Sequence, residues 1–217
     1  MNAPPSIRVH RRADLPAALE RLGLLLDVPV LSVVGGADGI SPPDLDVVSS
    51  LLEAVIVPLL GECGATVVYG GTDSGVMRVV GRVRPDGGFP LVGVAAAGTI
   101  DGIELEPNHT HFVVVPGTRW GDESPWLFDV AAGIAGTRTS ATVVVNGGEI
   151  TLGDMEHSLA RRIPVLVLAG TGRAADRVAA GAGDDRIRRI AKSPLTYVAD
   201  VHDRDAVRNR LKSLLLR

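Results

Sequence analysis

Residues 30–39 read Val-Leu-Ser-Val-Val-Gly-Gly-Ala-Asp-Gly, and this stretch shows the pattern that decides the fold. A short, mostly apolar run that suits a buried strand is followed at once by glycines. Such runs recur along the chain, and most lack the period-two alternation of a half-exposed strand. A strand that is apolar on both faces belongs inside a parallel sheet covered by helices. The pattern predicts strands at residues 6–10, 30–34, 65–69, 91–95, 112–115, 142–145, 165–168 and 196–199.

Helical patterns lie between these strands and alternate with them. They cover residues 15–26, 44–62, 75–84, 124–135, 151–161, 173–180 and 204–216. This alternation predicts an α/β fold of the doubly wound, Rossmann-like kind, with a mostly parallel sheet and helices on both of its faces. A chain of 217 residues fits one such domain, and we expect a single domain over 1–217.

Composition excludes several classes of function. The formal net charge is −3 and the 22 basic residues are scattered, so no basic surface is expected to hold nucleic acid. The single cysteine, Cys63, excludes an internal disulfide framework and suits a reducing compartment. The first residues have no apolar signal segment, and the longest apolar runs are far shorter than the roughly 18 residues of a membrane span. We therefore expect a cytoplasmic protein without a nucleic-acid or membrane partner.

Four glycine-rich turns each follow a predicted strand and precede a predicted helix. The carboxyl ends of parallel strands lie on one edge of the sheet, so these turns are expected to meet at one crevice. Glycine lets the backbone approach a phosphate, and a helix N-terminus supplies N–H groups and partial positive charge. This pattern predicts a nucleotide site. The turns are Gly35-Gly36-Ala37-Asp38-Gly39, Gly70-Gly71-Thr72-Asp73-Ser74-Gly75, Asn146-Gly147-Gly148 and Gly170-Thr171-Gly172-Arg173.

An alternative stays open for each turn, because tight strand-to-helix connections need glycine for positive φ whatever the function. At Gly75 the two interpretations differ most clearly. Either Gly75 lets a phosphate approach the first N–H groups of the next helix, or it relieves crowding between helix and strand. The hydroxyls of Thr72, Ser74 and Thr151 and the guanidinium of Arg173 would add donors to a nucleotide.

Three common nucleotide or hydrolase motifs do not account for these turns. The P-loop pattern is absent, since no lysine precedes position 192. A dinucleotide fingerprint, Gly170-x-Gly172-x-x-Ala175, occurs near the end of the chain rather than in its first βαβ unit, so hydride transfer is not favoured. The serine of Gly71-Thr-Asp-Ser74-Gly75 is one place away from the nucleophile position of a hydrolase elbow.

The densest polar segment is Glu104-Leu-Glu-Pro-Asn108-His109-Thr-His111. His109 and His111 would share a strand face and could form half of a zinc site with Asp101 or Glu104. No further His or Cys completes a tetrahedral set, so no metal is expected. Hydrogen bonds of Asn108, His109 and His111 to ribose or phosphate, or structural contacts, are favoured.

A loop with one arginine and one tryptophan comes next. Arg119 is expected to bind a pyrophosphate and Trp120 to stack on adenine, with capping of the following helix as the alternative role of Trp120.

Five elements in this order resemble the SLOG superfamily, and in particular its branch similar to the N-terminal cytosolic region of melastatin-type TRP channels. They are Gly35-Gly36-Ala37, the run from Tyr69 to Met77, Asn108-His-Thr-His-Phe112, Val144-Val-Asn-Gly-Gly148 and Gly170-Thr-Gly-Arg-Ala-Ala-Asp176, and the resemblance covers about residues 30–180. It implies a modified Rossmann fold and a ligand sensor without catalysis. The implied ligand is an NAD-derived adenine nucleotide, with ADP-ribose as the leading candidate, and no cofactor is required.

Motifs and resemblance together predict one set of ligand-binding residues. It comprises Gly35, Gly36, Ala37, Gly70, Gly71, Thr72, Ser74, Gly75, Val76, Met77, Asn108, His109, His111, Arg119, Asn146, Gly147, Gly148, Thr151, Gly170, Gly172 and Arg173.

The same superfamily contains the lonely-guy phosphoribohydrolases, which cleave the N-glycosidic bond of a nucleoside monophosphate. Their signature is Pro-Gly-Gly-x-Gly-Thr-x-x-Glu, and this chain departs from it with Asn-Gly-Gly-Glu-Ile-Thr-Leu-Gly-Asp over residues 146–154. The proline and the third glycine are replaced, so no catalytic residue is expected in the leading hypothesis. If the chain is an enzyme, Asp154 or Glu149 would serve as the acid or base. The superfamily also leads us to expect a homodimer formed through helices on one face.

Overall fold

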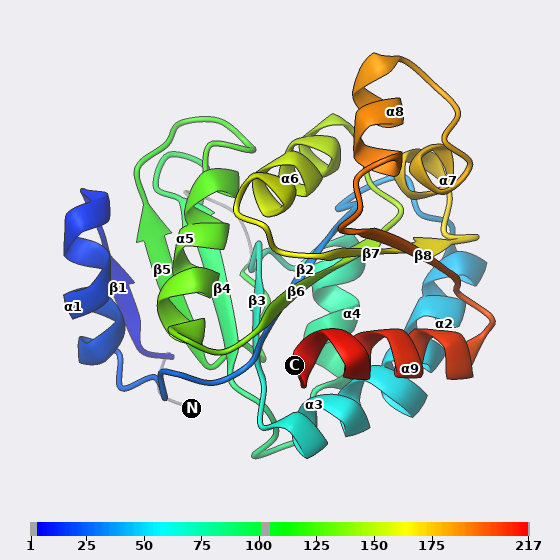
Figure 1. Ribbon diagram of the computed structural model, residues 1–217. Helices are drawn as coiled ribbons and strands as arrows, with labels where there is room; N and C mark the ends of the chain where they lie inside the picture. Colours follow the sequence, from blue (N-terminus) through cyan, green and yellow to red (C-terminus); the bar gives the residue numbers. More distant parts are fainter. Residues whose placement is uncertain (1–3, 101–104, 217) are drawn as a thin grey trace.

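The computed structural model describes residues 4–100 and 105–216, whose strands form one eight-stranded parallel sheet. The strand order is β1-β5-β4-β3-β2-β6-β7-β8, which confirms the predicted α/β architecture (Figure 1). The observed strands lie within about two residues of those predicted. They are β1 (Ser6–Arg8), β2 (Val30–Gly35), β3 (Thr66–Tyr69), β4 (Leu91–Ala96), β5 (His111–Val115), β6 (Ser140–Val145), β7 (Val165–Ala169) and β8 (Thr196–Asp200).

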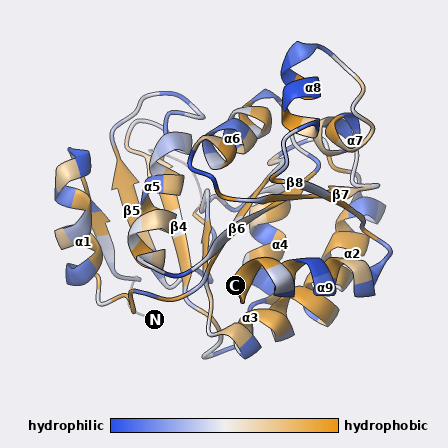
Figure 2. Cartoon of the chain, viewed as in Figure 1, coloured by the Kyte–Doolittle hydropathy of each residue, from blue (hydrophilic) through white to orange (hydrophobic). Residues whose placement is uncertain are grey.

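Apolar side chains on both faces of the central strands create two large cores, and a small third cluster joins Ala95, Phe112 and Val114. Val30 and Val34 of β2 belong to one core, and Leu31 and Val33 belong to the other. In Figure 2 the labelled inner strands are mainly in the hydrophobic colour, whereas the helices carry both hydrophobic and hydrophilic colours. One face is covered by α1 (Leu15–Arg21), α5 (Ser124–Ala135), α6 (Glu149–Ala160), α7 (Arg173–Ala179) and α8 (Asp185–Ala191), and the other by α2 (Pro42–Leu51), α3 (Val57–Cys63), α4 (Gly75–Val83) and α9 (Arg204–Leu215).

The sheet changes winding direction between β2 and β6. From β2 the chain adds β3, β4 and β5 in order on one side, and it then crosses back to place β6 on the other side of β2. Open α/β sheets bind ligands at such a switch point, outside the carboxyl ends of the strands. The fold therefore directs attention to the turns that follow β2, β3 and β6.

The helices differ from the prediction at three places. The first ends at Arg21 rather than near residue 26, because Gly23 adopts a φ of +73°. The helical run 42–63 is continuous but contains a π-helical turn, η2 (Leu52–Ile56), just before Pro58, whose missing N–H interrupts the regular ladder. Helix α8 was not expected, and the side chain of Asp184 caps it.

No helix in residues 4–100 or 105–216 combines the length and the apolar character that crossing a bilayer requires.

Candidate functional site

A cavity of about 860 Å³ opens at the carboxyl edge of the sheet, where its winding direction changes. This volume falls within the usual range of small-molecule sites. Of the residues predicted to bind ligand, the cavity is lined by Gly35, Gly36, Ala37, Gly70, Thr72, Ser74, Met77, Gly148, Thr151 and Arg173. The other lining residues are Val33, Val34, Asp38, Asp73, Trp120, Glu123, Ser124, Leu127, Glu149, Ile150 and Asp154.

One wall of the cavity is suited to an anion. Helix α6 begins after Gly148, and the Oγ1 atom of Thr151 accepts a hydrogen bond of 3.3 Å from the amide of Gly148. The first turn of a helix presents N–H groups without intrahelical partners and a partial positive charge. Arg173 reaches the same place, where its Nη1 donates to the carbonyl of Asp38 at 2.7 Å. A Cβ at position 148 would lie 3.0 Å from Nη2 of Arg173, so glycine leaves room for the guanidinium.

Arg173 makes no ion pair with any carboxylate in the part of the chain that the structure describes. Among the described residues its guanidinium donates one hydrogen bond, to a backbone carbonyl, so it retains further donors. A planar guanidinium beside a helix N-terminus is a strong combination for phosphate recognition. This wall is therefore the most specific chemical feature of the cavity.

Carboxyl groups line the cavity near the start of α5. Asp154 of α6 is almost fully buried and faces the start of α5, where Glu123 and Ser124 also line the cavity. Burial raises the pKa of Asp154 to about 7, a hydrogen bond from Ser124 partly opposes the shift, and the charge of Glu123 adds to it. Burial also raises the pKa of Glu123. The cavity thus has Arg173 on one wall and two carboxyl groups of raised pKa on another.

An apolar surface lies at the mouth of the cavity. Trp120 and Ile150 line it, and both side chains are about half exposed. They come together because Gly121, next to Trp120, lies against Ile150, with 3.4 Å between a Cβ built at Gly121 and the nearest Ile150 carbon. Exposed aromatic surface at the edge of a cavity suits a planar ring.

Comparisons with known proteins place this chain in a family. A family model described as "SLOG in TRPM, prokaryote" matches residues 28–210. The chain belongs to this family. The match confirms the resemblance that the glycine turns and the Asn-His-Thr-His segment carry, and it extends beyond the 30–180 core expected for it.

Two curated relatives of this SLOG chain are TRPM channels. The chain is 25% identical over 261 residues to TRPM-like protein 2 of Nematostella vectensis, covering 95% of the chain and 17% of that protein. It is 27% identical over 203 residues to TRPM2 of Rattus norvegicus, covering 71% of the chain and 13% of that protein. The chain thus spans less than a fifth of the length of these relatives.

A solved structure with the same fold is the molybdenum cofactor carrier protein of Chlamydomonas reinhardtii. It matches with a TM-score of 0.57 and 19% identity, over 88% of the SLOG chain and 99% of that protein. At this identity the likeness concerns the fold alone.

Gly75 does not line the cavity, although the prediction placed a phosphate against it. A Cβ at this position would lie 2.1 Å from the carbonyl oxygen of Gly36, and the backbone has a φ of +46°. The neighbouring amide of Val76 donates to that same carbonyl at 3.1 Å. The structure therefore favours the crowding interpretation, in which glycine lets the start of α4 pack against the turn after β2.

Asn146 and Gly147 hold the end of β6 instead of lining the cavity. The amide of Asn146 donates to Oγ1 of Thr171 at 2.8 Å, and its side chain donates to the carbonyl of Thr171 at 2.6 Å. The Oδ1 atom of Asn146 accepts from the amide of Gly147 at 2.7 Å. These bonds tie the end of β6 to the turn after β7.

The turn 170–172 already holds a carboxylate of the chain itself. Asp176 accepts from the amides of Gly170 and Gly172 at 2.7 and 3.1 Å. Neither glycine lines the cavity, so the dinucleotide fingerprint found in the sequence does not offer its N–H groups to a phosphate here.

The Asn-His-Thr-His segment leads into the amino end of β5 and does not line the cavity. His111 is the first residue of β5, and its Nδ1 contacts Oγ1 of Thr110 at 2.8 Å. His109 is buried, contacts the carbonyl of Glu106 through Nδ1 and packs against Phe112. Asn108 donates to the buried carboxylate of Glu106 at 2.7 Å. These residues have structural contacts, the second of the two roles predicted for them.

Three further predicted residues lie outside the cavity lining. Gly71 packs against Phe112, whose Cε2 would lie 2.5 Å from a Cβ at position 71. Val76 is fully buried in the core. Arg119 extends outward and pairs with Asp122 at 3.7 Å, whereas its neighbour Trp120 reaches the cavity.

The metal interpretation of the histidines finds no support in the described residues. Among residues 4–100 and 105–216, no three His, Cys, Asp or Glu side chains are grouped as a metal site requires. The two carboxylates considered for that site, Asp101 and Glu104, lie outside the described residues.

Proposed function

We propose that this SLOG domain is a nucleotide sensor whose cavity binds ADP-ribose or another NAD-derived adenine nucleotide without chemical change. The observation that carries the proposal is Arg173, which has no carboxylate partner among the described residues and lies beside the N-terminus of α6 at the switch point of the sheet. This combination favours a phosphorylated ligand. The family relation to TRPM channels supports a sensing role rather than a catalytic one.

The different residues at the two ends of the cavity indicate how the nucleotide would be oriented in it. Phosphates would bind at the first turn of α6 under Arg173, since N–H groups and a guanidinium are donors. Adenine would stack on Trp120 at the mouth. The carboxyl groups of Glu123 and Asp154 would accept hydrogen bonds from ribose hydroxyls.

One observation favours the second candidate, an N-glycosidic hydrolase acting on a nucleotide. Asp154 lines the cavity, is almost fully buried and has a pKa raised to about 7, and these are properties of a general acid. Glu149, the other acidic candidate, is paired with Arg186 at 3.0 Å and is therefore the weaker choice. Asp154 would carry the proton transfer if the domain is an enzyme.

Two measurements on the purified domain separate these candidates. A ligand that binds only the folded state raises the melting temperature, so ADP-ribose should raise it in a panel with NAD, AMP and ATP. A flat response to the whole panel at millimolar concentration would contradict nucleotide binding. The sensor proposal also expects no adenine release from AMP, and release that disappears in Asp154→Ala would establish the hydrolase instead.

The remaining parts of the proposal concern context. We expect the domain to act in the cytoplasm as a homodimer, with a small nucleotide and not nucleic acid as its partner, and without a cofactor. A monomeric mass by light scattering would contradict the dimer.

A further inference from the structure

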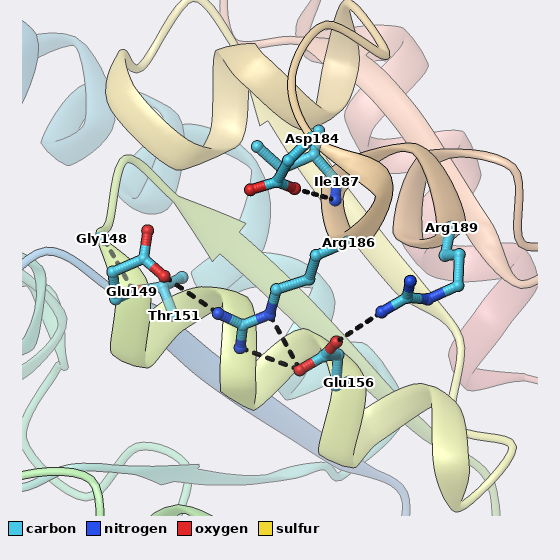
Figure 3. A network of polar contacts seen from close by, with 8 residues as sticks. All are labelled: Gly148, Glu149, Thr151, Glu156, Asp184, Arg186, Ile187 and Arg189. Carbon is cyan, nitrogen blue, oxygen red and sulfur yellow. Dashed lines mark hydrogen bonds and ion pairs between the residues drawn. The ribbon is translucent and has the colours of Figure 1, made fainter.

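An arginine of α8 reaches across to the first residue of α6. The Nη1 atom of Arg186 lies 3.0 Å from Oε2 of Glu149, while its Nε and Nη2 donate to Oε2 of Glu156 at 3.0 and 2.8 Å. Figure 3 shows this guanidinium lying between the two glutamates, with Arg189 approaching Glu156 from the other side. One cation of α8 therefore holds two carboxylates of α6.

The two glutamates that bind Arg186 lie on the same face of α6. Glu149, Gly153 and Glu156 are spaced i, i+4 and i+7, so they share one face of the helix. At the middle position a Cβ would lie 3.6 Å from Nη2 of Arg186, an ordinary van der Waals contact, so the guanidinium lies directly over this face of the helix. The hydrogen bond with Glu156 raises the pKa of Arg186, so the cation stays charged.

Glu149 would otherwise disturb the proposed phosphate site. It is the first residue of α6 and lines the cavity beside Gly148 and Arg173. A carboxylate is itself stabilised at a helix N-terminus, so it competes there with an anionic ligand and repels it. The pair with Arg186 draws this carboxylate toward α8 and compensates its charge.

We propose that Arg186 is a positioning residue for the ligand, because it holds the Glu149 carboxylate on the α8 side and keeps the N-terminus of α6 open for a phosphate. The inference rests on the anion-binding part of the proposed function. A freed carboxylate about 6 Å from a doubly charged phosphate, in surroundings of about the dielectric constant of water, weakens binding about tenfold.

The test is a double-mutant cycle read by calorimetric titration at low ionic strength, with ADP-ribose and inorganic pyrophosphate as separate probes. We expect Arg186→Gln to weaken binding of both probes about tenfold. Glu149→Gln should strengthen binding about twofold at most in the parent, but about tenfold in the Arg186→Gln background. Arg189→Gln is the matched control, since it removes the same charge from the same helix and contacts Glu156 but not Glu149.

The outcomes distinguish this inference from the proposed function. Rescue of Arg186→Gln by the second substitution supports the inference, because a merely misfolded α8 would not recover. The inference is overturned if Arg186→Gln binds as the parent does, if Arg189→Gln weakens binding equally, if Glu149→Gln strengthens binding equally in both backgrounds, or if the parent binds neither probe. Arg186-dependent binding of pyrophosphate without any ADP-ribose binding would leave the inference standing and refute the nucleotide proposal.

Discussion

Replacing the buried carboxyl of Asp154 with an amide should change how stability depends on pH. Asp154 is almost fully buried, and Asp154→Asn keeps the size of the side chain and an oxygen that can accept from Ser124. The variant therefore removes the titration with little change in shape. Any constant difference in packing between the two proteins does not vary with pH.

The raised pKa of Asp154 determines both the sign and the size of the expected change in stability with pH. In the folded chain the pKa of Asp154 rises from its usual 3.8 to about 7, chiefly through burial. Between these values the unfolded chain has lost the proton while the folded chain keeps it, so the parent loses stability as pH rises. Because one pKa unit corresponds to about 1.4 kcal/mol, the full loss is about 4 kcal/mol above neutral pH.

The assay is urea denaturation of both proteins from about pH 4 to about pH 8. The free energy of unfolding of Asp154→Asn minus that of the parent should grow by about 4 kcal/mol across this range. Asp27→Asn is a control with the opposite sign, since hydrogen bonds from Thr137 lower the pKa of Asp27 and its contribution is lost as pH falls. A difference between parent and Asp154→Asn that stays constant with pH would refute the reasoning.

Other consequences of the geometry can be measured by chemical denaturation. Gly75→Ala should destabilise the fold by about 3 kcal/mol, because its Cβ would meet the Gly36 carbonyl at positive φ. Gly87→Ala, with positive φ but open space around it, should cost only about 1 kcal/mol, and equal losses at the two sites would show that crowding is not the cause. Asp176→Ala should cost about 1–3 kcal/mol, because the amides of the turn 170–172 lose their acceptor, whereas Asp176→Asn keeps one acceptor oxygen and should lose less. Identical stabilities of the two Asp176 variants would contradict this account of the turn.

The inner strands were predictable because each is a short, mostly apolar run whose two faces are both buried. A helix that packs only slightly on the core was harder to predict. Of α8, only Ile187 and Ile190 are buried in the core, and its other residues are mostly charged. Part of the cavity followed from the rule that glycine turns after parallel strands meet at one edge.

The same rule explains why the Asn-His-Thr-His segment does not line the cavity. The Asn-His-Thr-His segment leads into the amino end of β5 instead of following its carboxyl end, where the cavity lies. The order of this segment and the predicted strand along the sequence was enough to predict that position. The role of Asp176 in the turn 170–172 was not predictable, because a carboxylate four residues after a glycine also fits an exposed helix face.

The meeting of two acidic side chains in the cavity could not be predicted, because it depends on a tertiary contact. Glu123 and Asp154 lie on different elements about thirty residues apart, and only the packing of α5 against α6 brings them to one cavity. Arg186 likewise meets Glu149 only because α8 packs on α6.

The most direct test of the central claim is a crystal structure of the domain with ADP-ribose. We expect the phosphates at the first turn of α6 within hydrogen-bonding distance of Arg173, and the adenine against Trp120. Ligand bound at the turn 170–172 or at the amino edge beside His111, with this cavity left empty, would contradict the account.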